Sequence, residues 1–261
     1  MTEREIREIF INQMCADFNC TREQFCSREN VFTERADNPG RRKFFTVDSP
    51  VKVLCTGGKI VLSARPDFYD ECREAFKDVN GAWFSNFRHM SKMNEILQKK
   101  GYRVFEFHHY YLPLGTEAVS KEQMKTFSDG LKFEHFDRES VERFRGDERF
   151  MRALSFLEDA PDVCAITASD REGILGMSGA SADSDTMWQI GIDVCANVRG
   201  RNLGALLTIM LKNEILEGGH LPYYGTAESH IQSQKVAVKS GFAPFWAEMV
   251  SAPAEKSSFY S

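Results

Sequence analysis

The sequence lacks the long apolar run that a membrane-spanning helix needs. No stretch approaches about 18 consecutive apolar residues, the length that a transmembrane helix requires. The segment from Met1 to Cys15 is charged and helical in pattern, and it lacks the apolar core of a signal peptide. We therefore expect a soluble, cytoplasmic protein without a membrane partner.

The cysteines form no recognisable binding or pairing pattern. There are seven of them, an odd number, and Cys15, Cys20 and Cys26 are the closest set. No CxxC occurs, and the spacings match no common zinc or iron–sulfur site. We expect reduced thiols, no metal ion and a reducing compartment.

The chain also has no excess of positive charge. Its formal net charge is -5, and this argues against generic nucleic-acid binding, which needs clustered positive charge. A local basic pocket for a small phosphorylated ligand stays open. The 261 residues, of which 42% are apolar, suffice for one large or two small domains with a packed core.

The first half alternates helical and strand patterns. Two β-branched runs flank Gly57-Gly58, and two glycines suit a tight hairpin turn. Residues 115–130 are polar without periodicity, and we place the domain boundary there. The expected elements are a helix over 3–18, an irregular stretch over 30–50, a hairpin over 51–64, helices over 66–79 and 85–100, and a strand over 102–114.

The second half predicts strands crossed by helices. This order favours an α/β or α+β fold, with a mixed, mostly antiparallel central sheet flanked by helices. We expect an N-terminal α+β accessory domain over 1–118 and a second domain over 119–261. The elements expected in the second domain are a helix over 140–157, strands over 163–169, 173–182 and 187–194, a helix over 203–217, a strand over 222–227, a helix over 231–240 and a strand over 242–250.

The strand over 187–194 has one apolar and one polar face. Alternation places Ile190, Ile192 and Val194 on the apolar side, which we expect to face the core. Gln189, Gly191 and Asp193 lie on the other side. A glycine in the middle of that side leaves the backbone accessible, so a ligand could approach the strand there.

A basic, glycine-containing turn follows this strand and opens a helix. It reads Arg199-Gly200-Arg201-Asn202-Leu203-Gly204-Ala205. Free N–H groups at a helix start and the helix dipole favour an anion, and arginine adds forked donors. The turn suits a pyrophosphate. A solvated basic connection before a core helix is the alternative that these residues leave open.

These residues resemble the acyl-CoA signature of the GNAT superfamily of N-acetyltransferases. In that family an apolar-x-Val strand end leads into Arg-Gly-x-Gly-x-Gly/Ala at a helix start. The matching residues are Ile192-Asp193-Val194 and then Arg199 to Gly204. Asn202 stands where the family usually has glycine, and asparagine tolerates the left-handed backbone region better than most residues.

A later block is similar to a second motif of the same family, Asn-x-x-Ser-x-x-x-Ala-x-x-x-Gly-Phe. His230 replaces the asparagine, while Ser233, Ala237, Gly241 and Phe242 match. The resemblance covers roughly residues 130–250. The N-terminal part is then either a divergent accessory domain or a degenerate second acyltransferase-like half.

The resemblance implies transfer of an acetyl group from acetyl-CoA, as co-substrate, to a primary amine of a small molecule or peptide, by direct attack in a ternary complex. It also leaves a homodimer open. The residues that it assigns to acetyl-CoA are Ile192, Asp193, Val194, Arg199, Gly200, Arg201, Asn202, Leu203, Gly204, Ala205, His230 and Ser233.

The resemblance gives no complete catalytic set. Many family members carry a proton-donating tyrosine where this chain has Ala237, so Tyr224, with Tyr223 and His230 behind it, is the substitute acid. Glu228 or Asp193 is the expected base, and Asp183 and Asp185 are weaker options.

Two other functions stay open. One is a catalytically weak acyl-CoA sensor or scaffold with the same fold. The other is transfer from a larger, aminoacyl-tRNA-like donor, which the acidic net charge disfavours.

Overall fold

The computed structural model describes residues 1–43, 49–115 and 130–256. The predicted domain boundary within 115–130, with its division after residue 118, therefore lies almost entirely outside the described residues. Contacts divide the described chain into two compact units that alternate along the sequence. The first unit contains residues 1–9, 42–43, 111–115 and 130–244, and the second contains residues 10–41, 49–110 and 245–256.

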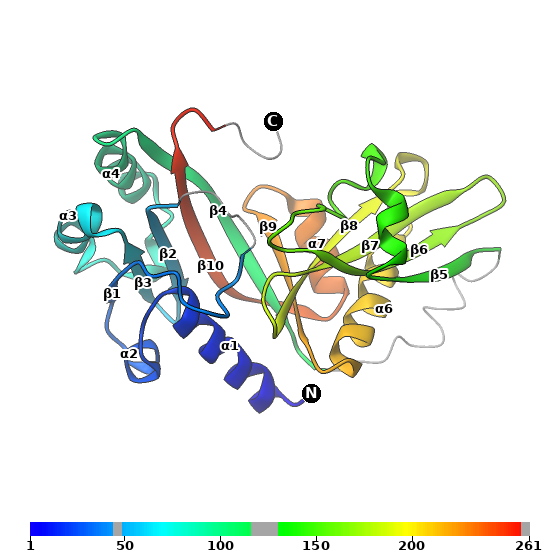
Figure 1. The fold of residues 1–261 in the computed structure, drawn as a ribbon, viewed down its shortest axis with the longest axis horizontal. Coiled ribbons are helices and arrows are strands. Elements are labelled where there is room, and N and C mark those ends of the chain that lie inside the picture. Colours follow the sequence, from blue (N-terminus) through cyan, green and yellow to red (C-terminus); the bar gives the residue numbers. More distant parts are fainter. Residues whose placement is uncertain (44–48, 116–129, 257–261) are drawn as a thin grey trace. The chain divides into compact units, whose positions relative to one another are not determined.

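The first unit is built on strands in the order β9-β8-β7-β6-β5 (Figure 1). Neighbouring strands are antiparallel from β5 to β8, whereas β8 and β9 are parallel. The strands are β5 (Lys132–Asp137), β6 (Asp162–Ser169), β7 (Ile174–Ala182), β8 (Met187–Val194) and β9 (Leu221–Ala227). All but β5 were expected from the sequence.

Helices cover one face of this sheet. α6 (Leu203–Glu217) and α7 (Ile231–Lys239) match the predicted helices. Most residues of α6 are buried, and Leu203, Leu207 and Leu211 join Ile166, Ile190 and Tyr224 in one core cluster. This packing confirms that Ile190 lies on the core face of β8.

The other face is covered by short 3-10 helices, and the α-helix predicted over 140–157 is wrong. The chain forms η2 (Ser140–Phe144) and η3 (Glu148–Phe150) there. Between them Gly146 has a φ of +85°, and after them Phe156 has a φ of +52°. An α-helix cannot pass through positive φ, so the apolar spacing is used instead by Phe144, Phe150 and Leu154 to pack under the sheet.

The second unit has strands in the order β1-β3-β2-β10-β4. The hairpin of β2 and β3 forms as predicted, with Gly57 and Gly58 at φ +57° and +81°. β1 pairs in parallel with β3, which corrects the irregular stretch expected over 30–50. The bounds are α1 (Glu3–Asp17), α2 (Arg22–Cys26), β1 (Val31–Glu34), β2 (Val51–Thr56), β3 (Lys59–Ala64), α3 (Pro66–Phe76), η1 (Gly81–Trp83), α4 (Phe87–Gln98), β4 (Tyr102–Pro113) and β10 (Phe242–Pro253).

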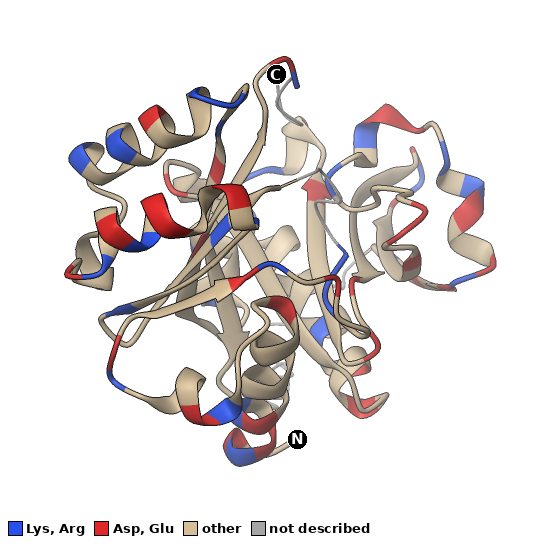
Figure 2. Ribbon diagram, turned by 60° about the vertical axis from the view of Figure 1, so that its left-hand side comes forward, with Lys and Arg blue, Asp and Glu red and all other residues tan. Residues whose placement is uncertain are grey.

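The predicted fold class is confirmed: the strands form mixed, mostly antiparallel sheet, and helices flank it. In the second unit, α3 and α4 pack over Val53, Ile60 and Leu62. Basic and acidic residues are interspersed along the helices rather than separated by sign (Figure 2). Within the described ranges, no helix has the length and apolarity to cross a membrane.

Candidate functional site

The parallel strands β8 and β9 separate partway along their length. Their pairing runs from Met187↔Leu221 to Ile190↔Tyr224, although β8 continues to Val194 and β9 to Ala227. On its other edge, β8 stays paired with β7 up to Gly176↔Val194. The edge of residues 191–194 that faces β9 therefore has backbone groups that β9 does not use, and an extended ligand could pair with them.

The turn after β8 has a left-handed backbone at its glycine and at its asparagine, the two residue types there that tolerate it. Asn202 has φ 61° and ψ 11°, which is the left-handed region, and Gly200 has a φ of +81°. Asn202 precedes α6 without capping it through its side chain. The first helical hydrogen bond goes from Leu206 N to Asn202 O (3.1 Å), so the N–H groups of residues 203–205 precede the helical ladder.

Three cations surround this helix start. Arg199 and Arg201 are exposed, and Arg199 Nε donates to the carbonyl of Val194 at 3.1 Å. Lys239, at the end of α7, donates from Nζ to Asn202 Oδ1 at 2.6 Å. Sequence reasoning missed Lys239, although it lies in the second motif two residues before Gly241. We call Arg199, Arg201, Lys239 and the start of α6 the anion cradle.

The polar face of β8 is covered by the chain itself. A Cβ added to Gly191 would lie 2.0 Å from the carbonyl oxygen of Arg152. Asp193 Oδ2 accepts hydrogen bonds from the backbone N–H of Arg152 (2.8 Å) and Ala153 (3.1 Å). Gly191 is thus needed for the approach of residues 152–153, and the expectation that a ligand approaches the strand on this face is wrong.

Burial raises the pKa of the Asp193 carboxyl, while the hydrogen bonds from the N–H groups of Arg152 and Ala153 oppose that rise. Its carboxylate has a structural task, because it accepts from the N–H of Arg152 and shares the N–H of Ala153 with the carbonyl of Phe150.

Three of the residues expected to bind acetyl-CoA are buried in α6. Leu203, Gly204 and Ala205 can reach a ligand only through backbone N–H groups. Gly204 also lets α6 lie close to β8, since an added Cβ would meet Val194 Cγ2 at 3.2 Å and Ile192 Cγ1 at 3.5 Å. The side chains of Ile192 and Val194 accordingly pack against the α6 core.

The second motif lies on α7, which starts after the exposed His230. Ser233 Oγ and the Tyr224 hydroxyl are 2.9 Å apart and share a hydrogen bond. Tyr224 is only 2% exposed, and Ala237, at the position of the family's tyrosine, is fully buried. Ser233 thus holds the hydroxyl of the residue expected to serve as acid.

Glu228 lies directly after β9, beyond the point at which β9 leaves β8, and it is exposed. Its backbone carbonyl accepts from Gln234 Nε2 at 2.7 Å. No hydrogen bond to its carboxylate is recorded among the described residues, so this carboxylate is available to a ligand.

Asp183 is fully buried and belongs to a different group. It accepts from Ser181 Oγ at 2.6 Å and from the hydroxyl of Tyr223. Burial raises its pKa to about 7. The neighbouring Asp185 is exposed. Over the described ranges, no three His, Cys, Asp or Glu side chains are grouped so that they could hold a metal ion.

Comparison with known proteins gives matches in structure alone. No family model and no curated sequence matches the chain. The GNAT resemblance recurs among solved structures. A tandem GNAT protein from the clavulanic acid biosynthesis pathway is similar at 12% identity, with 98% of each chain covered and a TM-score of 0.48.

Two further similar structures carry the same family description. A GCN5-related N-acetyltransferase-like protein from Streptococcus suis is 18% identical, with 78% of this chain and 86% of that chain covered and a TM-score of 0.45. A GCN5-related N-acetyltransferase from Kribbella flavida is 16% identical, with 61% and 63% covered and a TM-score of 0.39.

Proposed function

We propose that the first unit binds acetyl-CoA and transfers its acetyl group to a primary amine of a small molecule or peptide. One observation carries the proposal: β8 and β9 separate after Ile190 and Tyr224, and β8 then leads directly into the anion cradle. An extended, pyrophosphate-containing ligand needs both an open strand edge and an anion site at one end of it.

In this proposal the cradle holds the pyrophosphate. Arg199 and Arg201 supply charge and forked donors, and the N–H groups of residues 203–205 point along the positive end of the α6 dipole. The pantetheine arm pairs with the open edge of Ile192, Asp193 and Val194. Gly200 and Asn202 give the turn its left-handed backbone, while His230 and Ser233 lie at the start of the neighbouring helix α7.

The reaction is a direct acyl transfer. The neutral amine nitrogen attacks the thioester carbonyl carbon, the carbon–sulfur bond breaks, and the electron pair leaves with the sulfur as thiolate. Backbone N–H groups of the open β8 edge would stabilise the oxygen as it becomes negative. The amine loses one proton to a base, and the thiolate gains one from an acid or from water.

Glu228 is our choice for the base, because its carboxylate is exposed and follows the separated end of β9. Asp193 is the weaker choice, since its carboxylate already accepts two backbone hydrogen bonds. Tyr224 remains our choice for the acid, and its hydrogen bond to Ser233 would orient the hydroxyl.

A second candidate function is an acyl-CoA-binding module with weak or no turnover. Ala237 replaces the usual tyrosine, and both Asp193 and Tyr224 are engaged within the protein. These three observations argue against efficient acid–base catalysis, but they do not bear on acetyl-CoA binding at the anion cradle.

The first experiment is calorimetric titration of the full chain with acetyl-CoA. The Arg199→Ala/Arg201→Ala double variant should bind at least about 30-fold more weakly, since two charge-assisted contacts are lost. Arg138→Ala removes an exposed arginine next to β5 and serves as the matched control. Wild-type affinity in the double variant would refute the cradle.

The second experiment separates the two candidate functions. Thiol release from acetyl-CoA is followed with a panel of primary amines, for wild type and Glu228→Gln. Amine-dependent release that Glu228→Gln reduces by about 100-fold or more supports the transferase. Tight acetyl-CoA binding without amine-dependent release supports the binding module.

A further inference from the structure

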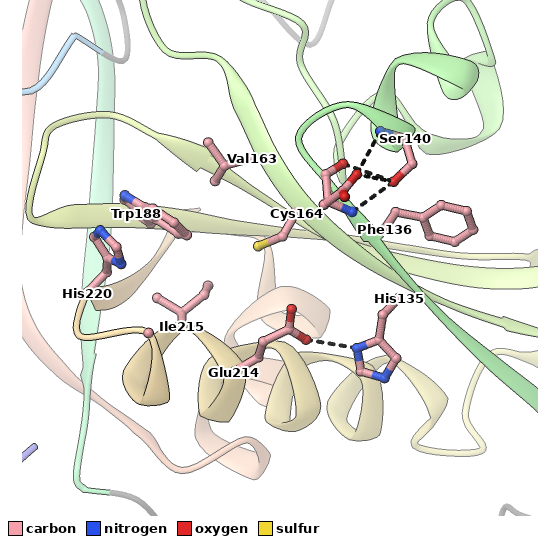
Figure 3. Close-up of a pocket in the computed structure, with 11 residues that line it drawn as sticks. His135, Phe136, Ser140, Val163, Cys164, Trp188, Glu214, Ile215 and His220 are labelled. Carbon is pink, nitrogen blue, oxygen red and sulfur yellow. Dashed lines mark hydrogen bonds and ion pairs between the residues drawn. The ribbon is translucent and has the colours of Figure 1, made fainter.

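A cavity opens at the C-terminal end of α6, and we call it the α6 C-terminal pocket (Figure 3). Its volume is about 450 Å³, within the range of pockets that hold small molecules. It lies between β5, β6, β8 and the last turns of α6. Its lining residues are His135, Phe136, Asp137, Ser140, Val163, Cys164, Trp188, Glu214, Ile215, Gly218 and His220.

The pocket is separate from the anion cradle. The cradle surrounds the start of α6 at Leu203, and the pocket is lined by Glu214, Ile215 and Gly218 at its end. The helix is 15 residues long, so at a rise of about 1.5 Å per residue its two ends lie about 20 Å apart. The pocket therefore needs a ligand of its own.

The charges around the pocket are negative. Asp137 and Glu214 are carboxylates, and the lining includes neither lysine nor arginine. The C-terminal end of a helix adds partial negative charge at the same place. His135 Nδ1 bonds Glu214 Oε2 at 2.8 Å, and the second oxygen of Glu214 can still accept a donor. This field favours a cation over an anion.

The inner part of the pocket is apolar and aromatic. Val163, Cys164 and Ile215 line it, and the indole of Trp188 stacks on the imidazole of His220 with ring centres 3.9 Å apart. An indole in such a wall packs against an apolar body and attracts a cation.

His220 supplies an unused polar atom in this wall. Its Nδ1 is buried, and no hydrogen-bond partner is recorded for it in the described part of the chain. A polar group of a ligand that reached this nitrogen would satisfy it, as donor or as acceptor according to the imidazole tautomer.

We infer that the α6 C-terminal pocket binds a small organic cation: a protonated primary amine attached to an apolar, preferably aromatic, body. The ammonium group pairs with Glu214, and the apolar body lies against Trp188, Val163 and Ile215. This inference does not depend on acetyl-CoA binding, because it concerns the opposite end of α6.

Three probes of similar size test the inference by calorimetry on the full chain. They are phenethylamine, which is a cation near neutral pH, 2-phenylethanol, which is neutral, and 3-phenylpropanoate, which is an anion. Phenethylamine should bind at least about tenfold more tightly than the other two. Equal binding of the alcohol, tighter binding of the carboxylate, or no binding of the amine at about 10 mM would each overturn the inference.

Variants test whether phenethylamine binds in the α6 C-terminal pocket. Glu214→Gln should weaken the binding of phenethylamine by about tenfold. Glu217→Gln, on the exposed last turn of α6, should leave this affinity unchanged. Cys164→Met puts a longer side chain into the cavity and should also weaken binding, with circular dichroism to check folding. If Glu214→Gln and Cys164→Met both bind as wild type does, the amine binds elsewhere and the inference fails.

Discussion

The ammonium of Lys239 donates a hydrogen bond to the side-chain oxygen of Asn202 at 2.6 Å, and so joins the end of α7 to the turn that opens α6. Asn202 thereby combines two properties. Its backbone is left-handed, as a glycine's could be, and its side chain brings a third cation to the anion cradle. A glycine at this position could supply only the first.

Lys239→Ala should therefore weaken acetyl-CoA binding by about three- to tenfold, because one cation near the phosphates is lost. The effect should shrink as salt is raised, since exposed charges are screened. Lys235→Ala, on the same helix one turn earlier, is the control. Calorimetry at two salt concentrations measures both variants, and equal effects from the two lysines would contradict the specific role of Lys239.

Asn202→Gly should keep the turn and fold normally, since glycine accepts a φ of 61° without steric strain. Asn202→Val should lower the free energy of unfolding by about 1–2 kcal/mol, because a β-branched residue is strained in the left-handed region. Urea denaturation measures the difference between the two variants. A valine variant as stable as the glycine variant would show that the turn is not held in this conformation.

Gly191→Ala should destabilise the first unit strongly, by about 2–4 kcal/mol, because its Cβ would lie 2.0 Å from the carbonyl oxygen of Arg152. Gly218→Ala is a matched control, since its Cβ would meet neighbours only at 3.4 Å or more. Urea denaturation compares both with wild type. A neutral Gly191→Ala would mean that residues 152–153 are not held against β8.

Asp193→Ala should cost about 1–2 kcal/mol of unfolding free energy, because the N–H of Arg152 loses its acceptor and the N–H of Ala153 keeps only the carbonyl of Phe150. Asp193→Asn keeps an acceptor oxygen at that position and should cost less than half as much. If Asp193 is structural, the asparagine variant also keeps turnover within about threefold. A loss of about 100-fold in turnover, with stability preserved, would instead identify Asp193 as the base.

The second unit contains a buried acid whose titration should be visible in stability. Burial raises the pKa of Glu106 to about 7, and the charges of Arg103 and Lys256 only partly oppose this rise. Burial also lowers the pKa of the neighbouring His108 to about 4, against the raising effect of Glu248. His108 Nδ1 lies 3.3 Å from Glu106 Oε2.

Whether stability rises or falls with pH depends on which state, folded or unfolded, holds the proton more tightly. The folded protein keeps Glu106 protonated at a pH where the unfolded chain has released that proton. The stability contributed by protonated Glu106 is therefore complete below about pH 4.5 and is lost as pH rises toward 7. For His108 the stability is present above pH 6.5 and is lost as pH falls toward 4.

The side chain of Glu106→Gln cannot ionise, so this variant should not lose stability as pH rises toward 7. Relative to wild type, its free energy of unfolding should rise between about pH 5 and pH 8 by about 2 kcal/mol. Denaturant unfolding across this pH range measures the difference. A difference between variant and wild type that does not change with pH would show that Glu106 titrates normally.

The sequence alone determined the elements whose signals are local. Gly57-Gly58 specified the β2–β3 hairpin through two positive φ angles, and alternation along β8 identified Ile190 as core. The turn from Arg199 to Gly204 and the helix after it were expected from the sequence, because turn chemistry and helix starts depend on neighbouring residues, and the left-handed Asn202 is one that asparagine tolerates. β1 and β5 were missed because short strands with weak alternation form only when a partner strand is present.

Only the tertiary structure decided what those residues do. The apolar residues over 140–157 are spaced as in an α-helix, but they belong to a 3-10 segment that packs under β7 and β8. Gly191 and Asp193 both take part in this packing. Lys239 reaches Asn202 from 37 residues away. The pocket at the end of α6 joins residues from β5, β6 and β8. Local sequence patterns carry no information on such long-range contacts, because these contacts depend on which surfaces pack together once the sheet has formed.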